Sequence, residues 1–183
     1  PLAHIFQRLV EHGILWSGTA IGYFHGNILE LVDDLKLIRP TTFTSVPRLY
    51  NRFGGVIKSQ TIEATGLRGA LSRRAVSTKT ANLKNPDPAK QTNQHMFYDR
   101  IWGRKVAGAL GLDRAANMVS GSAPLDPDLH QFLRVVFGNN FGQGYGLTET
   151  YGTSLIQAEG DYTVGTCGGC MPTSELCLID VPD

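Results

Sequence analysis

Two strand-like segments, residues 115–120 and 140–143, each run directly into a turn that is rich in glycine. Between them, residues 127–137 carry apolar side chains at the three- and four-residue spacing of an amphipathic helix. A strand, a helix and a second strand in this order form a crossover between parallel strands. Because ligands of α/β proteins gather beyond the carboxyl ends of such strands, both turns are expected at one binding edge.

The rest of the chain continues this alternation of strands and helices. Residues 41–45 and 19–24 have the composition of further strands, and residues 176–180 are strand-like as well. Helices are expected over residues 3–16, 67–81 and 97–110, and a further helix is expected to begin at Pro47. Two more helices are expected to begin after capping residues. Asn27 caps one of them, with Glu30 at its third position, and Asp126 caps the other. Residues 82–94 read as an exposed, proline-containing loop. The predicted fold class is therefore α/β, built from parallel-sheet βα units.

Composition narrows the classes of function. The 183 residues include 17 basic and 16 acidic side chains, so there is no electrostatic basis for binding nucleic acid. No apolar run reaches the roughly 18 residues that a membrane-spanning helix needs. Cys167 and Cys170 have the spacing of a zinc half-site or a redox pair. Structural zinc usually takes four ligands, so the two cysteines are interpreted as intracellular thiols in a turn.

The second glycine turn, within residues 142–150, carries the side chains that a nucleotide site uses. An aromatic face can stack on a base, a threonine hydroxyl can contact a phosphate oxygen, and carboxylate oxygens suit Mg²⁺. Glycines let the backbone come close to a ligand. The same residues also fit a plain strand-to-turn connection, with Tyr145 half-buried in a strand and Glu149 a solvated acid at a helix start.

Four segments together resemble a known family. Residues 145–150, Tyr-Gly-Leu-Thr-Glu-Thr, resemble the core motif of adenylate-forming enzymes, which include acyl-CoA synthetases, luciferases and peptide-synthetase adenylation domains. Residues 1–8 and 40–50 resemble two blocks of long-chain fatty acyl-CoA synthetases, and residues 119–125 resemble the glycine turn that precedes the core motif. Because the four blocks stand in the family's order, the chain is identified as a central piece of such a synthetase.

The resemblance implies catalytic roles for three residues. Thr148 corresponds to the contact with the α-phosphate of ATP, and Glu149 corresponds to the ligand of Mg²⁺. His4 corresponds to the histidine near the carboxylate end of the acyl pocket. From the residues alone, His4 also fits a partly buried histidine of a helix.

The resemblance also implies a nucleotide-binding set. Tyr145 corresponds to the aromatic residue that stacks on adenine, between Gly144 and Gly146. The other turn is expected to lie along the adenine and the acyl-adenylate, and it consists of Gly121, Ser122, Ala123 and Pro124.

The activity that the resemblance implies is ATP-dependent conversion of a long-chain fatty acid to an acyl-adenylate and then to acyl-CoA. ATP, Mg²⁺ and coenzyme A are the implied cofactors, and fatty acid, ATP and CoA are the implied partners. The implied location is intracellular, with peripheral association with endoplasmic reticulum, peroxisome or lipid droplet as a family property.

Residues 1–183 are expected to form part of the large adenylation domain. The phosphate loop is expected upstream, and the ribose motif and the domain with the catalytic lysine are expected downstream. The chain alone is therefore not expected to complete adenylation. Three alternatives remain: a ligase for another acyl or aryl acid, a nucleotide-binding module without catalysis, and an interaction domain without a ligand.

Overall fold

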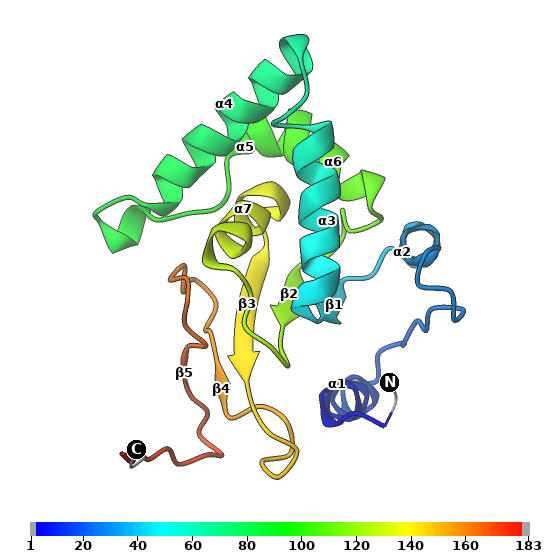
Figure 1. Ribbon diagram of the computed structural model, residues 1–183, viewed down its shortest axis with the longest axis vertical. Coiled ribbons are helices and arrows are strands. Elements are labelled where there is room, and N and C mark those ends of the chain that lie inside the picture. The colour runs from blue at the N-terminus through cyan, green and yellow to red at the C-terminus, as the bar shows by residue number, and fades with distance from the viewer. Residues whose placement is uncertain (1–2, 181–183) are drawn as a thin grey trace.

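A five-stranded mixed sheet forms the centre of the computed structural model, which describes residues 3–180 (Figure 1). β1 (Thr42–Ser45), β2 (Asn117–Ser120) and β3 (Asn140–Tyr145) are parallel neighbours, whereas β4 (Leu155–Ile156) and β5 (Gly169–Cys170) continue the sheet in antiparallel fashion. The parallel part confirms the predicted α/β class. The two antiparallel strands are only two residues long, which is too short for a periodic sequence pattern.

Seven α-helices surround this sheet within the described residues. They are α1 (Ile5–Trp16), α2 (Leu31–Ile38), α3 (Pro47–Gln60), α4 (Gly66–Leu83), α5 (Met96–Tyr98), α6 (Arg104–Ala109) and α7 (Pro127–Phe137). A short 3₁₀ helix, Pro88–Lys90, lies in the loop after α4, and a π-helical turn, Asp99–Gly103, joins α5 to α6. Pro1 and Leu2, which begin the first family-like block, lie outside the described residues.

Helix α7 is the crossover between β2 and β3, and it lies at the centre of the core. It packs against α3, α4, α6 and β3. As predicted, Asp126 is its N-cap, since Oδ1 accepts a hydrogen bond of 2.8 Å from the amide of Leu129. Gly138 ends the helix with a φ of 61°, the left-handed conformation that glycine adopts without strain. The main core cluster contains Leu129, Phe132, Leu133 and Val136 of this helix, together with Tyr50, Phe53, Met118 and Phe141.

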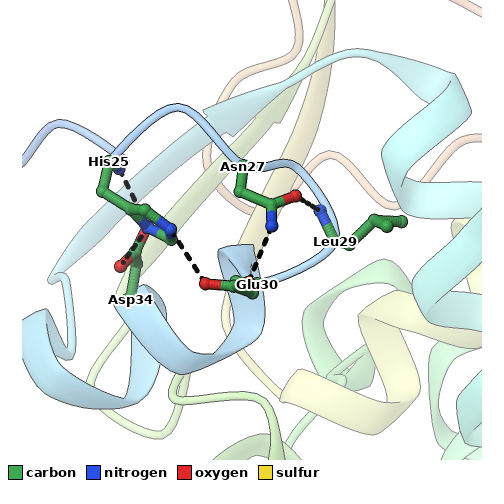
Figure 2. A network of polar contacts seen from close by, with 5 residues as sticks. All are labelled: His25, Asn27, Leu29, Glu30 and Asp34. Atoms are coloured by element: carbon green, nitrogen blue, oxygen red, sulfur yellow. Dashed lines mark hydrogen bonds and ion pairs between the residues drawn. The ribbon is translucent and has the colours of Figure 1, made fainter.

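The expected helix after Asn27 begins later than predicted, with Glu30 as the N-cap and Leu31 as the first helical residue. Figure 2 shows the reason. The Asn27 side chain accepts a hydrogen bond from the amide of Leu29 and donates one of 2.7 Å to the Glu30 carboxylate. The other Glu30 oxygen lies 2.9 Å from His25 Nε2. Glu30 is thus engaged by side chains, and Asn27 caps a turn rather than the helix.

Residues 19–24 do not form the predicted strand, and that prediction is wrong. They follow an irregular path, and β1 pairs only with β2 among the described residues. A strand requires a partner ladder as well as a suitable composition. The end of this path is fixed instead at His25, whose amide and ring both hydrogen-bond to the Asp34 carboxylate of α2. The ring's hydrogen bond to Asp34 is the largest cause of the raised pKa of His25, and its contact with Glu30 adds to the shift.

Other predicted elements need smaller corrections. The predicted loop at 82–94 is in part wrong, because α4 extends to Leu83 and two of the residues are buried rather than exposed. Leu83 packs in the interior, and Asn93 donates a hydrogen bond of 2.6 Å to the carbonyl of Asn139. Residues 176–180 are irregular rather than extended in a sheet. The helix at 97–110 is helical up to Ala109, but the π-helical turn interrupts its α-helical pattern.

The core contains a histidine that must stay neutral. His130 of α7 is fully buried, and its Nε2 donates to the carbonyl oxygen of Phe141 at 3.0 Å, so Nδ1 carries no proton. Nδ1 has no hydrogen-bond partner among residues 3–180. Protonation would therefore place an unpartnered charge in the interior, and burial lowers the pKa of His130 to about 4.

This pKa predicts a loss of stability in acid. Between about pH 6.5 and pH 4 the unfolded chain binds a proton that folded His130 does not, so the free energy of unfolding falls as pH falls, by up to about 3 kcal/mol. Urea denaturation at several pH values measures this loss. A His130→Gln variant, which retains a donor for Phe141 but does not titrate, should lose this component. The exposed His25→Gln control should keep it, and an unchanged pH dependence in His130→Gln would refute the assignment.

Candidate functional site

The two glycine turns meet because β2 and β3 are parallel and in register. Ser120 is paired with Gln143, so the turns that follow leave the same edge of the sheet side by side. A Cβ atom placed on Gly121 would lie only 3.8 Å from the carbonyl oxygen of Gly144 and 3.4 Å from the ring of Phe6. The expectation that both turns share one edge is confirmed.

The first turn presents three exposed residues between two buried anchors. The anchors are Gly121 and Leu125. The amide of Gly121 donates a hydrogen bond of 3.2 Å to the carbonyl of Ser45 on β1, and the amide of Leu125 donates one of 2.7 Å to Gln143 Oε1. The exposed residues are Ser122, Ala123 and Pro124. Ser122 has a φ of 70°, an uncommon left-handed conformation for a residue with a side chain. The backbone of this turn is therefore fixed at both ends and open to a ligand between them.

The second turn is closed by its own backbone and admits no side chain at Gly146. A Cβ atom there would lie 1.2 Å from the carbonyl oxygen of Gly152. The amide of Gly152 donates to Leu147, and the amide of Leu147 donates to Thr150 Oγ1 at 3.0 Å. Tyr145 stands at the base of this turn at the end of β3, with 46% of its surface exposed. Its ring is available on the binding edge rather than packed in the interior.

Thr148 and Glu149 lie at the exposed tip of the second turn. Glu149 is in a turn, not at the start of a regular helix. Among residues 3–180 its carboxylate makes no hydrogen bond or ion pair, and no three acidic, histidine or cysteine side chains there are grouped to hold a metal. Mg²⁺ is commonly held by one or two carboxylates together with phosphate oxygens. A single free carboxylate at this edge fits that mode of binding.

Helix α1 lies across both turns. The ring of Phe6 is near Gly121, Leu9 packs beside Gly152, and His12 Nδ1 contacts the hydroxyl of Tyr151. His4 is exposed and caps this helix, since its Nδ1 accepts a hydrogen bond of 3.2 Å from the amide of Phe6. Among the described residues, its ring makes no hydrogen bond to either turn. The structure therefore places His4 at the N-terminal end of α1, the helix that contacts both turns, but not within either turn.

The complete chain, residues 1–183, matches the family model of the AMP-binding enzymes. The chain belongs to the AMP-binding enzyme family. Penicillium brevicompactum acyl-CoA ligase 891, peroxisomal, is 60% identical over all 183 residues, which cover 26% of that protein. Arabidopsis thaliana long chain acyl-CoA synthetase 6, peroxisomal, is 38% identical, and human long-chain-fatty-acid–CoA ligase 1 is 37% identical. Each is matched along 100% of this chain and 25% of its own length.

A solved structure supports the same assignment. The adenylation domain of a carboxylate reductase from Mycobacterium chelonae superposes with a TM-score of 0.53 at 26% identity, over 81% of this chain and 19% of that one. This confirms the fold expected of an AMP-binding enzyme. The chain spans about a quarter of the length of the curated relatives that it matches.

Sequence reasoning missed an apolar cavity beside the site of this AMP-binding enzyme. The cavity has a volume of about 920 Å³ and lies between α1, residues 17–24, α2 and β1. Its lining includes Val10, Ile14, Ile21 and Phe43, and it reaches Ser45. Because the carbonyl of Ser45 accepts the amide of Gly121, the cavity ends next to the first turn. The irregular course of residues 19–24 forms part of its wall, and no sequence pattern predicts such a course.

Gln143 is a second feature that was missed. A polar side chain in the middle of an otherwise buried strand is a detectable signal, but the pattern alone does not indicate its partners. Gln143 is 4% exposed and bonds to Leu125 at the end of the first turn.

No described helix is both long and apolar enough to cross a membrane.

The contact at Gly146 predicts that this glycine cannot be replaced. Gly146→Ala forces the second turn to shift away from Gly152, at a cost of about 1–3 kcal/mol, or roughly 5- to 150-fold in AMP affinity. Calorimetric titration with AMP, on the full-length protein that contains this chain, measures the loss. Gly169→Ala is the control, since a Cβ atom on that β5 glycine meets no atom within 4 Å. Equal affinity for the two variants would refute the role of the close contact.

Proposed function

We propose that this chain is part of a ligase that activates a long-chain fatty acid with ATP and then transfers the acyl group to coenzyme A. The observation that carries the proposal is the meeting of three features at one sheet edge. Two glycine-containing turns adjoin each other, a helix lies across both, and an apolar cavity ends beside them. The match to acyl-CoA ligases and long-chain acyl-CoA synthetases supports the same activity.

The nucleotide would be held between the two turns. Tyr145 offers an exposed ring for the adenine, and the backbone from Gly121 to Pro124 offers a surface along which the adenylate can lie. Thr148 is the contact for the α-phosphate. Glu149, whose carboxylate is free, is the protein ligand for an Mg²⁺ ion that neutralises phosphate charge when bound.

The acid would place its hydrocarbon tail in the cavity and its carboxylate at the end next to Gly121. A volume of about 920 Å³ lies within the range of roughly 300–1,000 Å³ that is typical of ligand pockets. Aliphatic side chains such as Val10, Ile14 and Ile21 supply much of the apolar lining, which favours a fatty acid over an aryl acid. His4 stands at the start of the helix between cavity and turns, and it is assigned to the carboxylate end.

In this reaction the acid carboxylate attacks the α-phosphorus of ATP and pyrophosphate leaves with the bonding electrons of the P–O bond. The thiol of coenzyme A then attacks the acyl carbon, and AMP leaves. Neither step requires a nucleophile from the protein, so the residues act by positioning the reactants and by neutralising charge.

The remaining parts of the ligase would come from the rest of the full-length protein. Residues 1–183 are proposed as part of the adenylation domain, with a phosphate loop before them and a lysine-bearing domain after them. The names of two relatives favour a peroxisomal location.

The test is pyrophosphate release by the full-length protein that contains this chain, with ATP, Mg²⁺ and palmitate. Glu149→Gln should lower kcat/KM by about 100-fold or more, because it removes the negative charge that holds the ion at the phosphates. Glu159→Gln is the matched control, since Glu159 is also exposed but lies near Asn140, at the opposite end of β3. Its activity should stay within about twofold of the wild type.

Coumarate in place of palmitate separates the alternatives. Release with coumarate alone would reassign the chain to an aryl acid ligase. AMP binding without release for any acid would favour a nucleotide-binding module without catalysis, and an absence of nucleotide binding would favour an interaction domain.

A further inference from the structure

Three buried polar side chains form one hydrogen-bonded group around β3, the strand that leads into the second turn. Gln143 on β3, Gln157 just after β4 and Arg134 on α7 are 4%, 5% and 1% exposed. A buried polar group without a hydrogen-bond partner destabilises the fold, so such residues persist where their hydrogen bonds are fulfilled. Here each of the three makes two or more hydrogen bonds.

Gln143 connects the turns to each other. Its Oε1 accepts a hydrogen bond of 2.7 Å from the amide of Leu125, where the first turn ends. Its Nε2 donates to the carbonyl of Thr166 at 3.1 Å. Its own backbone lies one residue before Gly144, where the second turn begins. One side chain thus spans from the base of the second turn to the end of the first.

The other two residues hold Gln143 in place. Gln157 Oε1 accepts a hydrogen bond of 2.9 Å from the backbone amide of Gln143 and one of 2.8 Å from Arg134 Nη2. Arg134 also donates to the carbonyls of Phe141 and Thr163. Burial lowers the pKa of Arg134 to about 10, which leaves the guanidinium charged at neutral pH. Strand β3, which leads into the second turn, is therefore held in place by the hydrogen bonds of Arg134 on helix α7.

We propose that Gln143 is a positioning residue whose carboxamide sets the spacing between the two turns and so shapes the gap for the adenylate. This inference rests on the proposed function, in which the nucleotide lies between these turns. The Gln143 side chain is buried, and its two hydrogen bonds go to Leu125 and Thr166. The role requires an acceptor facing Leu125 and a donor facing Thr166, which a carboxamide provides. Leucine provides neither group, and an ionised glutamate provides only the acceptor.

The test uses the full-length protein that contains this chain and measures AMP affinity by calorimetry, with KM for ATP and kcat as second readouts. Gln143→Leu leaves the buried amide of Leu125 without a partner, and its AMP affinity should fall at least tenfold. KM for ATP should rise by a similar factor. If Gln143 only supported folding, loss of folded protein would lower kcat while KM and the AMP affinity of the remaining protein stayed at wild-type values.

Gln143→Glu gives a second readout that remains informative if the leucine variant does not fold. A protonated carboxyl group supplies both an acceptor and a donor, so this variant should regain AMP affinity as pH is lowered from 8 to 6. The ratio to the wild type at each pH removes effects that both proteins share. A ratio that stays as low at pH 6 as at pH 8 would contradict the proposal.

The control is Asn93→Leu, which removes a buried amide that bonds to Asn139 near the opposite edge of the sheet. It should change thermal stability but leave AMP affinity within about twofold. An equal loss of AMP affinity in Asn93→Leu would overturn the inference, as would wild-type affinity in Gln143→Leu. Wild-type AMP binding without pyrophosphate release from any acid would instead refute only the proposed ligase activity.

Discussion

The parallel register between β2 and β3 determines where every element of the candidate site lies. Four consecutive residue pairs, from Asn117 with Asn140 to Ser120 with Gln143, align the ends of the two strands. Helix α7 fixes that register because it connects the strands and fills the core beneath them. A slip by one residue would move Gln143 to the other face of the sheet and separate it from Leu125. The site thus depends on the packing of a helix that does not contribute a residue to either turn.

Much of this arrangement could be predicted because it has local causes. The cap at Asp126, the apolar stripe of α7 and the two strands around it follow from spacing and side-chain chemistry. The close approach of the two turns follows from the rule that parallel strands end at one edge. The same local reasoning located Tyr145 and Glu149 on that edge, although their roles toward a ligand remain proposals.

The errors arose where the outcome depends on a side-chain partner outside the segment itself. Residues 19–24 have the composition of a strand, yet His25 is fixed to Asp34 and the segment lines a cavity instead. Asn27 has the residue type of a helix cap, but Glu30 is engaged by His25 and the helix begins after it (Figure 2). In both cases a side chain nine residues or fewer away decided the structure, and propensity gave no indication of the pairing.

The buried polar cluster reconciles an open site with a well-defined shape. The two turns expose Ser122, Tyr145 and Glu149, so apolar packing around these residues cannot hold them in place. Directional hydrogen bonds can do so from below, because an amide fixes both the distance and the angle of its partners, whereas an aliphatic contact tolerates sliding. Arg134 extends this restraint to α7, and Gln143 extends it to the first turn. The core thereby imposes its geometry on an edge that must remain accessible to a nucleotide.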